Sequence, residues 1–341
     1  MQIVPIKKAV GMVLGYDITE IIPGQFKGAA FKKGHIIHET DIPKLLNIGK
    51  KHIYVVNLSE DMIHENEAAR RMAEAAIGCG VTLSDPSEGK IELLSTGKGL
   101  LKVNAAALEQ INLLEGIMFA TIHGGHIVQN GQKLGGTRII PLAIPQKDIE
   151  TVEHICESFY PVITVKPVKP HTIGIVTTGS EVYHGRIEDK FGPVLEKKFN
   201  TLGSHILRQV IVDDDIEMIA GAIRELIKEG ADFIATTGGM SVDPDDVTPS
   251  GIKAAGGSVL TYGAPVLPGA MFLLAEIDGI PIVGLPACVM YVRTSIFDLI
   301  VPRLLANETV TRLDIARLGY GGCCMGCEEC RYPKCGFGKG D

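Results

Sequence analysis

The stretch Thr236–Thr248 most constrains the fold, because a glycine turn, a hydroxyl and two carboxylates follow directly on a short apolar strand. Residues 231–235 have the composition of a buried strand, and residues 246–255 can form a helix. Open α/β sheets bind ligands at such strand-to-helix loops. Gly238 and Gly239 let backbone amides approach a phosphate, since no side chain intervenes.

The acidic pair in this loop adds a second requirement. Asp245 and Asp246 would repel a bound phosphate unless a divalent cation lay between them. The loop therefore predicts a magnesium-bridged phosphorylated ligand. An alternative stays open, in which Ser241 or Asp246 only caps the helix and the glycines only turn the chain.

A second segment, Gly174–Val182, repeats the order of strand, threonine, glycine and acid. Between the two segments we predict helices at 193–202 and 216–229 and a strand at 206–212, followed by the acidic turn Asp213–Asp215. Strands that alternate with helices predict an α/β fold with a doubly wound, mostly parallel sheet. The apolar run 290–305 is expected to form one buried closing helix.

These motifs together resemble the molybdopterin-binding domain of molybdenum cofactor biosynthesis proteins. The similar pieces are Thr177–Glu181, the turn 213–215, Thr237–Val242 with Asp246, and Pro268–Gly269 followed by Gly284–Pro286. The resemblance covers about residues 170–306. Residues 1–57 show a weaker similarity to the molybdopterin molybdotransferase, or Mo-insertase, branch.

The resemblance implies a set of site residues. Glu181, Asp214 and Asp246 would surround molybdate or magnesium, where carboxylates can hold the metal that neutralises a phosphate. The alternative for each acid is a solvated surface carboxylate or a helix cap. The residues implied in binding molybdopterin, possibly adenylylated, are Thr178, Gly179, Ser180, Gly238, Gly239, Ser241, Asp245, Pro268, Gly269 and Pro286.

The chain departs from the family pattern at places that bear on catalysis. Ala287–Val289 stands where the family has glycine, asparagine and proline, and Asp243–Pro244 replaces a glycine. The insertase's Met-Asp-Gly-Tyr-Ala segment is absent. We therefore weigh two functions: a molybdotransferase that inserts molybdate, and a carrier or sensor of the cofactor that docks an acceptor molybdoenzyme. The family resemblance also implies a homodimer.

The C-terminal segment carries an unrelated signal, because five of the eight cysteines lie within residues 323–335. Cys324, Cys327 and Cys330 repeat a Cys-x-x-Cys spacing, and Cys335 follows. Four thiolates can converge on one metal centre, for which an iron–sulfur cluster ranks first, zinc second and disulfides third.

Composition limits the remaining function classes. The net charge is −7 and no basic run occurs, so nucleic acid is not an expected partner. The first ten residues lack an apolar signal core, and prolines interrupt the longest apolar stretch, so we expect neither export nor a membrane span. A cytoplasmic protein is therefore expected.

We predict four regions along the chain. They are a β-rich region at 1–61, an α+β middle domain and linker at 62–168, the α/β ligand domain at 169–308, and the cysteine-rich segment at 309–341.

Overall fold

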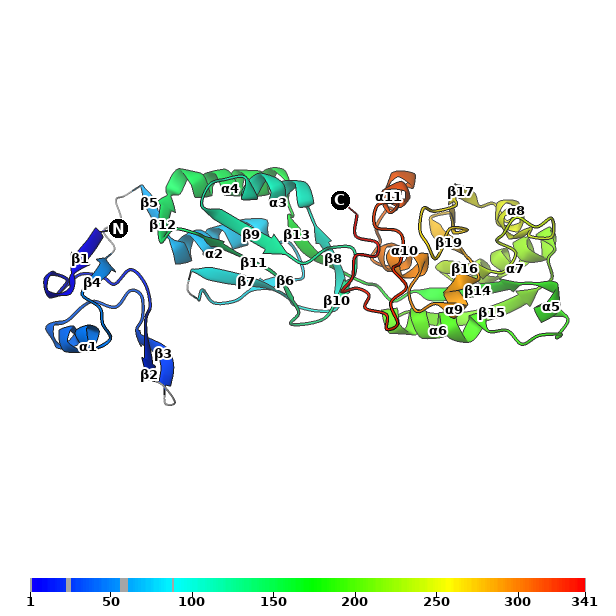
Figure 1. Ribbon diagram of the computed structural model, residues 1–341. Coiled ribbons are helices and arrows are strands. Elements are labelled where there is room, and N and C mark those ends of the chain that lie inside the picture. Colours follow the sequence, from blue (N-terminus) through cyan, green and yellow to red (C-terminus); the bar gives the residue numbers. More distant parts are fainter. Residues whose placement is uncertain (1, 23–25, 56–60, 88, 341) are drawn as a thin grey trace. The chain divides into compact units, whose positions relative to one another are not determined.

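The structure is a computed structural model that describes residues 2–22, 26–55, 61–87 and 89–340. The chain forms two compact units (Figure 1). The first unit comprises described residues within 1–97, 102–122 and 130–165, and the second comprises 98–101, 123–129 and 166–340. No helix in the described ranges is long and apolar enough to cross a membrane.

The N-terminal part of the first unit is built from two antiparallel strand pairs. They are β1 (Gln2–Pro5) with β4 (His52–Val55), and β2 (Ile18–Ile22) with β3 (Phe26–Phe31). One α-helix, α1 (Ile42–Asn47), and two 3-10 turns, η1 (Ile6–Lys8) and η2 (Glu39–Asp41), complete it. Leu14, Ile37 and Leu45 are fully buried in its apolar core.

A four-stranded antiparallel sheet forms the rest of the first unit. Helix α2 (Glu65–Ala76) packs on it, with Ala69 and Ala73 against Ile91. In sheet order the strands are β6 (Val81–Leu83), β7 (Lys90–Ser95), β11 (Lys133–Ile139) and β9 (Ile117–Thr121). This part also contains β5 (Met62–His64), α3 (Ala105–Asn112) and β12 (Ala143–Pro145).

Helix α4 (Gln146–Ser158) was not expected from the sequence. Ile149, Val152 and Cys156 are its buried residues, at intervals of three and four that place them on one helical face. This apolar spacing is the sequence feature that predicts the helix. Residues 163–167, at the end of the region predicted as middle domain and linker, form strand β13 (Ile163–Pro167).

The second unit contains a six-stranded sheet in which four strands are parallel. In sheet order the strands are β15 (His205–Val212), β14 (Thr172–Thr178), β16 (Phe233–Thr237), β19 (Ile280–Leu285), β18 (Leu273–Ile277) and β17 (Ser258–Tyr262). Strand β18 pairs antiparallel with both of its neighbours, β19 and β17. A short antiparallel pair, β8 (Gly99–Val103) with β10 (Ile127–Val128), lies outside this sheet.

Successive side chains of the central strands alternate between two apolar clusters, as the period of two in a strand requires. Phe233 belongs to the cluster that contains side chains of α6 (Phe191–Leu202) and α10 (Ile296–Leu305). Its neighbour Ile234 belongs to the cluster that contains side chains of α7 (Ile216–Lys228) and α8 (Thr248–Ala254). These residues confirm a mixed α/β fold.

The apolar run 290–305 does not form one helix. It contains the end of α9 (Cys288–Tyr291) and the whole of α10, separated by Val292–Ser295. The break is specified locally, because Ser295 accepts a hydrogen bond from the Phe297 amide and the Asp298 carboxylate accepts one from the Ser295 amide. This capping box begins a new helix at Ile296.

Candidate functional site: the carboxyl edge of the parallel sheet

The four parallel strands end at the same level of the sheet. Thr178 lies opposite Val212, Thr177 opposite Thr237, and Thr237 opposite Leu285. The segments that follow these strands therefore leave one edge side by side. Most of the predicted site residues lie on these segments: Thr178, Gly179, Ser180, Glu181, Asp214, Gly238, Gly239, Ser241, Asp245, Asp246 and Pro286.

The acidic turn after β15 holds the start of the short helix α5 (Ser180–Tyr183). The Ser180 amide donates a hydrogen bond to the Asp214 Oδ2 at 2.9 Å, and the Ser180 hydroxyl donates one to Asp213. The His184 Nε2 lies 3.4 Å from the Asp213 carboxylate. The hydrogen bond from Ser180 lowers the pKa of Asp213, with smaller contributions from the Asp214 amide and His184.

The predicted acid Asp214 is therefore engaged in holding Ser180 in place. Glu181 differs, because among the described residues its carboxylate accepts no hydrogen bond and forms no ion pair. The Glu181 side chain is exposed. A carboxylate without a protein partner at this edge is available to a ligand or a cation.

The glycine turn after β16 lies directly against the end of β14. A Cβ atom at Gly238 would lie 2.1 Å from the Thr178 carbonyl oxygen, and one at Gly239 would lie 2.6 Å from the Thr248 hydroxyl. Both glycines have positive φ, at 83° and 53°. The close approach and the left-handed backbone require glycine at Gly238.

Thr248 joins the two loops, although the sequence analysis did not select it. Its hydroxyl donates to the Gly238 carbonyl oxygen at 2.9 Å and lies 3.0 Å from the Thr178 hydroxyl. The residue is fully buried at the start of α8. A threonine at the first position of a helix, ten residues after a glycine, is too common a pattern to reveal this role from sequence.

Tyr262, at the end of the edge strand β17, was also missed. Its hydroxyl donates to the carbonyl oxygens of Met240 at 2.8 Å and Ser241 at 3.1 Å. Burial, and then the charge of Asp246, raises the pKa of Tyr262. The tyrosine thus fixes the loop backbone from a strand that is remote in sequence.

The Asp246 carboxylate bonds to the backbone of the exposed part of the loop. Its Oδ2 accepts a hydrogen bond of 3.3 Å from the Asp243 amide. Ser241 and Asp245 are exposed, and Asp246 is half-buried. The alternative from the sequence, that Ser241 or Asp246 caps this helix, is wrong, because α8 begins at Thr248 without a side-chain cap.

Replacement of Thr248 by valine is expected to lower the free energy of unfolding by about 2 kcal/mol, because the Gly238 carbonyl would lose its buried donor. Urea unfolding followed by circular dichroism measures the change. Thr236→Val is the matched control, since that buried hydroxyl donates to the Val283 carbonyl within the sheet. Equal loss of ligand binding in both variants would contradict a specific role for Thr248.

Two predicted site residues lie elsewhere. Gly269, with φ at 135°, packs against Ile296, because a Cβ atom there would lie 2.5 Å from the Ile296 Cβ. Pro268 lines a pocket together with the C-terminal cysteines. The motif Pro268–Gly269 therefore positions α10 and the cysteine-rich segment.

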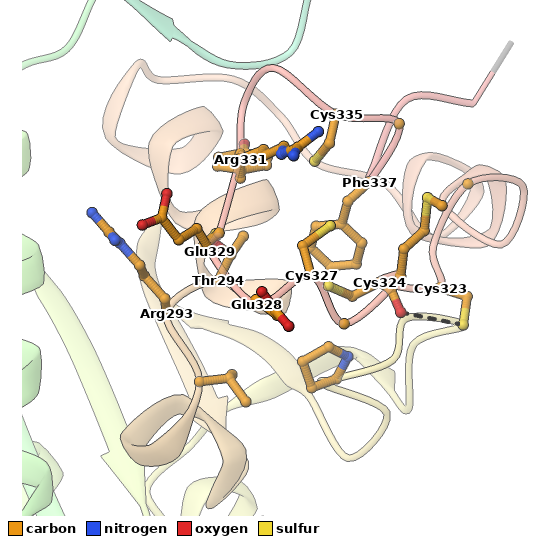
Figure 2. A pocket seen from close by; sticks show the side chains of 18 residues that line it. Arg293, Thr294, Cys323, Cys324, Cys327, Glu328, Glu329, Arg331, Cys335 and Phe337 are labelled. Atoms are coloured by element: carbon orange, nitrogen blue, oxygen red, sulfur yellow. Dashed lines mark hydrogen bonds between the residues drawn. The ribbon is translucent and has the colours of Figure 1, made fainter.

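The C-terminal cysteines line one pocket of about 750 Å³ (Figure 2). All five thiols of residues 323–335 contribute, including the predicted ligands Cys324, Cys327, Cys330 and Cys335, and all are free. However, within the described part of the chain no three His, Cys, Asp or Glu side chains are close enough to ligate one ion. The expected convergence of four thiolates is thus not seen.

Two parts of the chain match known family models. Residues 174–306 match a family model described as a probable molybdopterin binding domain. Residues 3–57 match a family model described only as a domain of unknown function.

Two named relatives are similar over parts of the chain. A molybdopterin adenylyltransferase of Pyrococcus furiosus is 35% identical over 95 residues, or 28% of this chain and 56% of the relative. A molybdopterin molybdenumtransferase of Staphylococcus aureus is 26% identical over 241 residues, or 69% of this chain and 52% of the relative. The chain thus spans about half the length of these relatives.

A solved structure described as the tungsten cofactor synthesizing protein MoaB of Pyrococcus furiosus is 24% identical. The match covers 36% of this chain and 84% of that structure, with a TM-score of 0.29.

Proposed function

We propose that the domain of residues 174–306, which matches the molybdopterin-binding family, binds molybdopterin at the carboxyl edge of its parallel sheet. The turn at Gly238 and Gly239 carries this proposal, because glycine has no side chain of its own to cover its backbone amide, and positive φ angles and the contact of Gly238 with β14 fix the shape of the turn. Such amides bind phosphate oxygens. Apolar clusters on both faces of the sheet support a doubly wound layout for this domain.

We further propose that this domain transfers molybdate into molybdopterin, which is possibly adenylylated. Glu181 has no ion-pair or hydrogen-bond partner for its carboxylate among the described residues, and Asp246 is half-buried beside the glycine turn, so each can present a carboxylate oxygen. Mg²⁺ commonly binds one or two carboxylates together with substrate phosphates and water, so these acids fit such an ion. The cation would neutralise phosphate charge, and the acids would position it. Asp214 would act indirectly by holding Ser180.

A carrier or sensor of the cofactor is the second candidate. It is favoured by the altered loop Ala287–Val289, where the half-buried Cys288 has a pKa raised by burial, as expected for a structural thiol. We also propose that the protein forms a homodimer and is located in the cytoplasm. As a carrier or sensor it would dock an acceptor molybdoenzyme.

Binding is tested by incubating the protein with molybdopterin, removing free ligand by gel filtration, and measuring the fluorescence of the oxidised pterin. We expect pterin to be retained in proportion to the protein. Retention no greater than in a reaction with unfolded protein would overturn the assignment.

Glu181→Gln separates the two candidate functions. A transferase is expected to keep pterin binding but to lose at least about tenfold in molybdate incorporation, since one charge near the developing product is removed. A carrier is expected to lose little of either. Glu188→Gln, an exposed glutamate on the same surface segment, is the matched control.

A further inference from the structure

The segment between Gly321 and Gly338 is a loop whose two ends are tied together. The Gly338 amide donates to the Gly321 carbonyl at 2.9 Å. Phe337 is only 4% exposed and packs in the core cluster that contains Leu299 of α10. In Figure 1 this segment, coloured red, lies beside α10. The base of the loop is therefore fixed to the domain.

The first part of the loop is also held by the backbone. The Leu267 amide donates to the Gly322 carbonyl, and the Cys324 amide donates to the Leu267 carbonyl, both at 2.8 Å. Further along, the Tyr332 hydroxyl donates to the Asp298 carbonyl at 3.2 Å. These contacts position the thiols but do not link them to one another.

The interior of the loop has little structure of its own. Residues 323–335 contain no helix or strand, and they share one backbone hydrogen bond, from the Lys334 amide to the Arg331 carbonyl at 2.7 Å. A compact loop of this length usually requires a cross-link or a function to remain ordered. Since all its cysteines are free thiols, disulfides do not supply that link here.

The five cysteines line the same pocket of about 750 Å³, although no three of these described side chains lie close enough together to ligate one ion. Figure 2 labels Cys323, Cys324, Cys327 and Cys335 around this pocket, together with Thr294 and Phe337. The Cys330 Sγ lies 3.1 Å from the Thr294 hydroxyl. Because few hydrogen bonds hold residues 323–335, a metal could draw these thiols together without breaking secondary structure.

We propose that this pocket is a four-thiolate metal site, with Cys324, Cys327, Cys330 and Cys335 as ligands and an iron–sulfur cluster as the favoured occupant. Three cysteines at three-residue steps followed by a fourth is a spacing that suits a cluster. Cys323 is left out, because it directly precedes Cys324 and does not belong to the three-residue steps. None of the residues that line this pocket lies in the loops after β14, β15 or β16.

The first test measures metal. The full chain is purified without oxygen and incubated either with Fe²⁺ and sulfide or with Zn²⁺, and metal and acid-labile sulfide per chain are measured after desalting. Iron with sulfide, or one zinc per chain, would support the site and identify its occupant. No retained metal under either condition would overturn it.

Matched cysteine variants test the ligand assignment. Cys330→Ser is expected to reduce bound metal at least about tenfold, whereas Cys323→Ser, which changes a thiol of the same pocket, should retain it. Equal loss in both variants, or loss only in Cys323→Ser, would contradict the assignment. Circular dichroism establishes that both variants are folded.

Proteolysis gives a readout that is independent of metal analysis. Arg331 and Lys334 are exposed trypsin sites inside the loop. Metal-loaded protein should be cleaved there at least about tenfold more slowly than metal-free protein, because ligation orders the loop. Identical cleavage rates would contradict the proposal. Because neither assay reads pterin, failure here is distinguishable from failure of the molybdopterin assignment.

Discussion

Gly238→Ala is expected to lower the free energy of unfolding by about 3 kcal/mol or more and to abolish retention of molybdopterin. The new Cβ would lie 2.1 Å from the Thr178 carbonyl oxygen, and a backbone atom cannot move aside as a flexible side chain can. The positive φ of 83° adds strain for alanine. Urea unfolding and pterin retention are measured on the same preparation.

Gly203→Ala is the matched control for this variant. Gly203 also has positive φ, at 93°, but nothing lies within 4 Å of the position of its Cβ. It ends α6, away from the carboxyl edge of the sheet. We expect a loss of about 1 kcal/mol from backbone strain alone, with pterin retained. Similar effects of the two substitutions would mean that contact with β14 does not shape the site.

Phe233→Ala is expected to cost about 4 kcal/mol of stability while leaving the carboxyl edge of the sheet intact. Phe233 is fully buried at the start of β16, and its ring stands edge-on to Phe199 with centroids 5.6 Å apart. Its removal would leave a cavity between the sheet and α6. The measurement is again urea unfolding, with Tyr320→Ala as an exposed aromatic control.

The effect of Phe233→Ala on binding separates stability from function. Phe233 lies four residues before Thr237, at the opposite end of β16 from the glycine turn. Under conditions where the variant is folded, we expect it to retain molybdopterin as well as the unmodified chain does. Loss of binding by folded Phe233→Ala would show that the edge loops depend on core packing more than their direct contacts indicate.

Local patterns in the sequence were enough to predict several elements of the ligand domain, although not its last strands or the break in the run 290–305. Strands followed by Thr-Gly turns, and a helix with apolar residues at helical spacing from Ile216, match β14, β16 and α7 within two residues. These features depend on neighbours in sequence, so they can be recognised without tertiary information. The same spacing occurs in α4 at Ile149, Val152 and Cys156, where no helix was predicted.

The candidate site was predictable only in part, because some of its contacts join residues that are distant in sequence. The glycine turn could be placed at a strand end because parallel strands align their carboxyl ends. The engagement of Asp214 with Ser180, however, joins residues 34 apart in sequence. The hydrogen bonds of Thr248 and Tyr262 likewise depend on which strands become neighbours, which no local spacing specifies.

The cysteine-rich segment shows which features the sequence determines and which only the tertiary structure determines. By itself the sequence determined that four thiols recur at metal-ligand spacing and that glycine, acid and hydroxyl groups follow successive strands. Only the tertiary structure decided that Pro268 lies beside those thiols and that Gly238 touches the end of β14. Composition and spacing select the chemistry that a chain can perform, whereas the packing of strands and loops determines which groups meet.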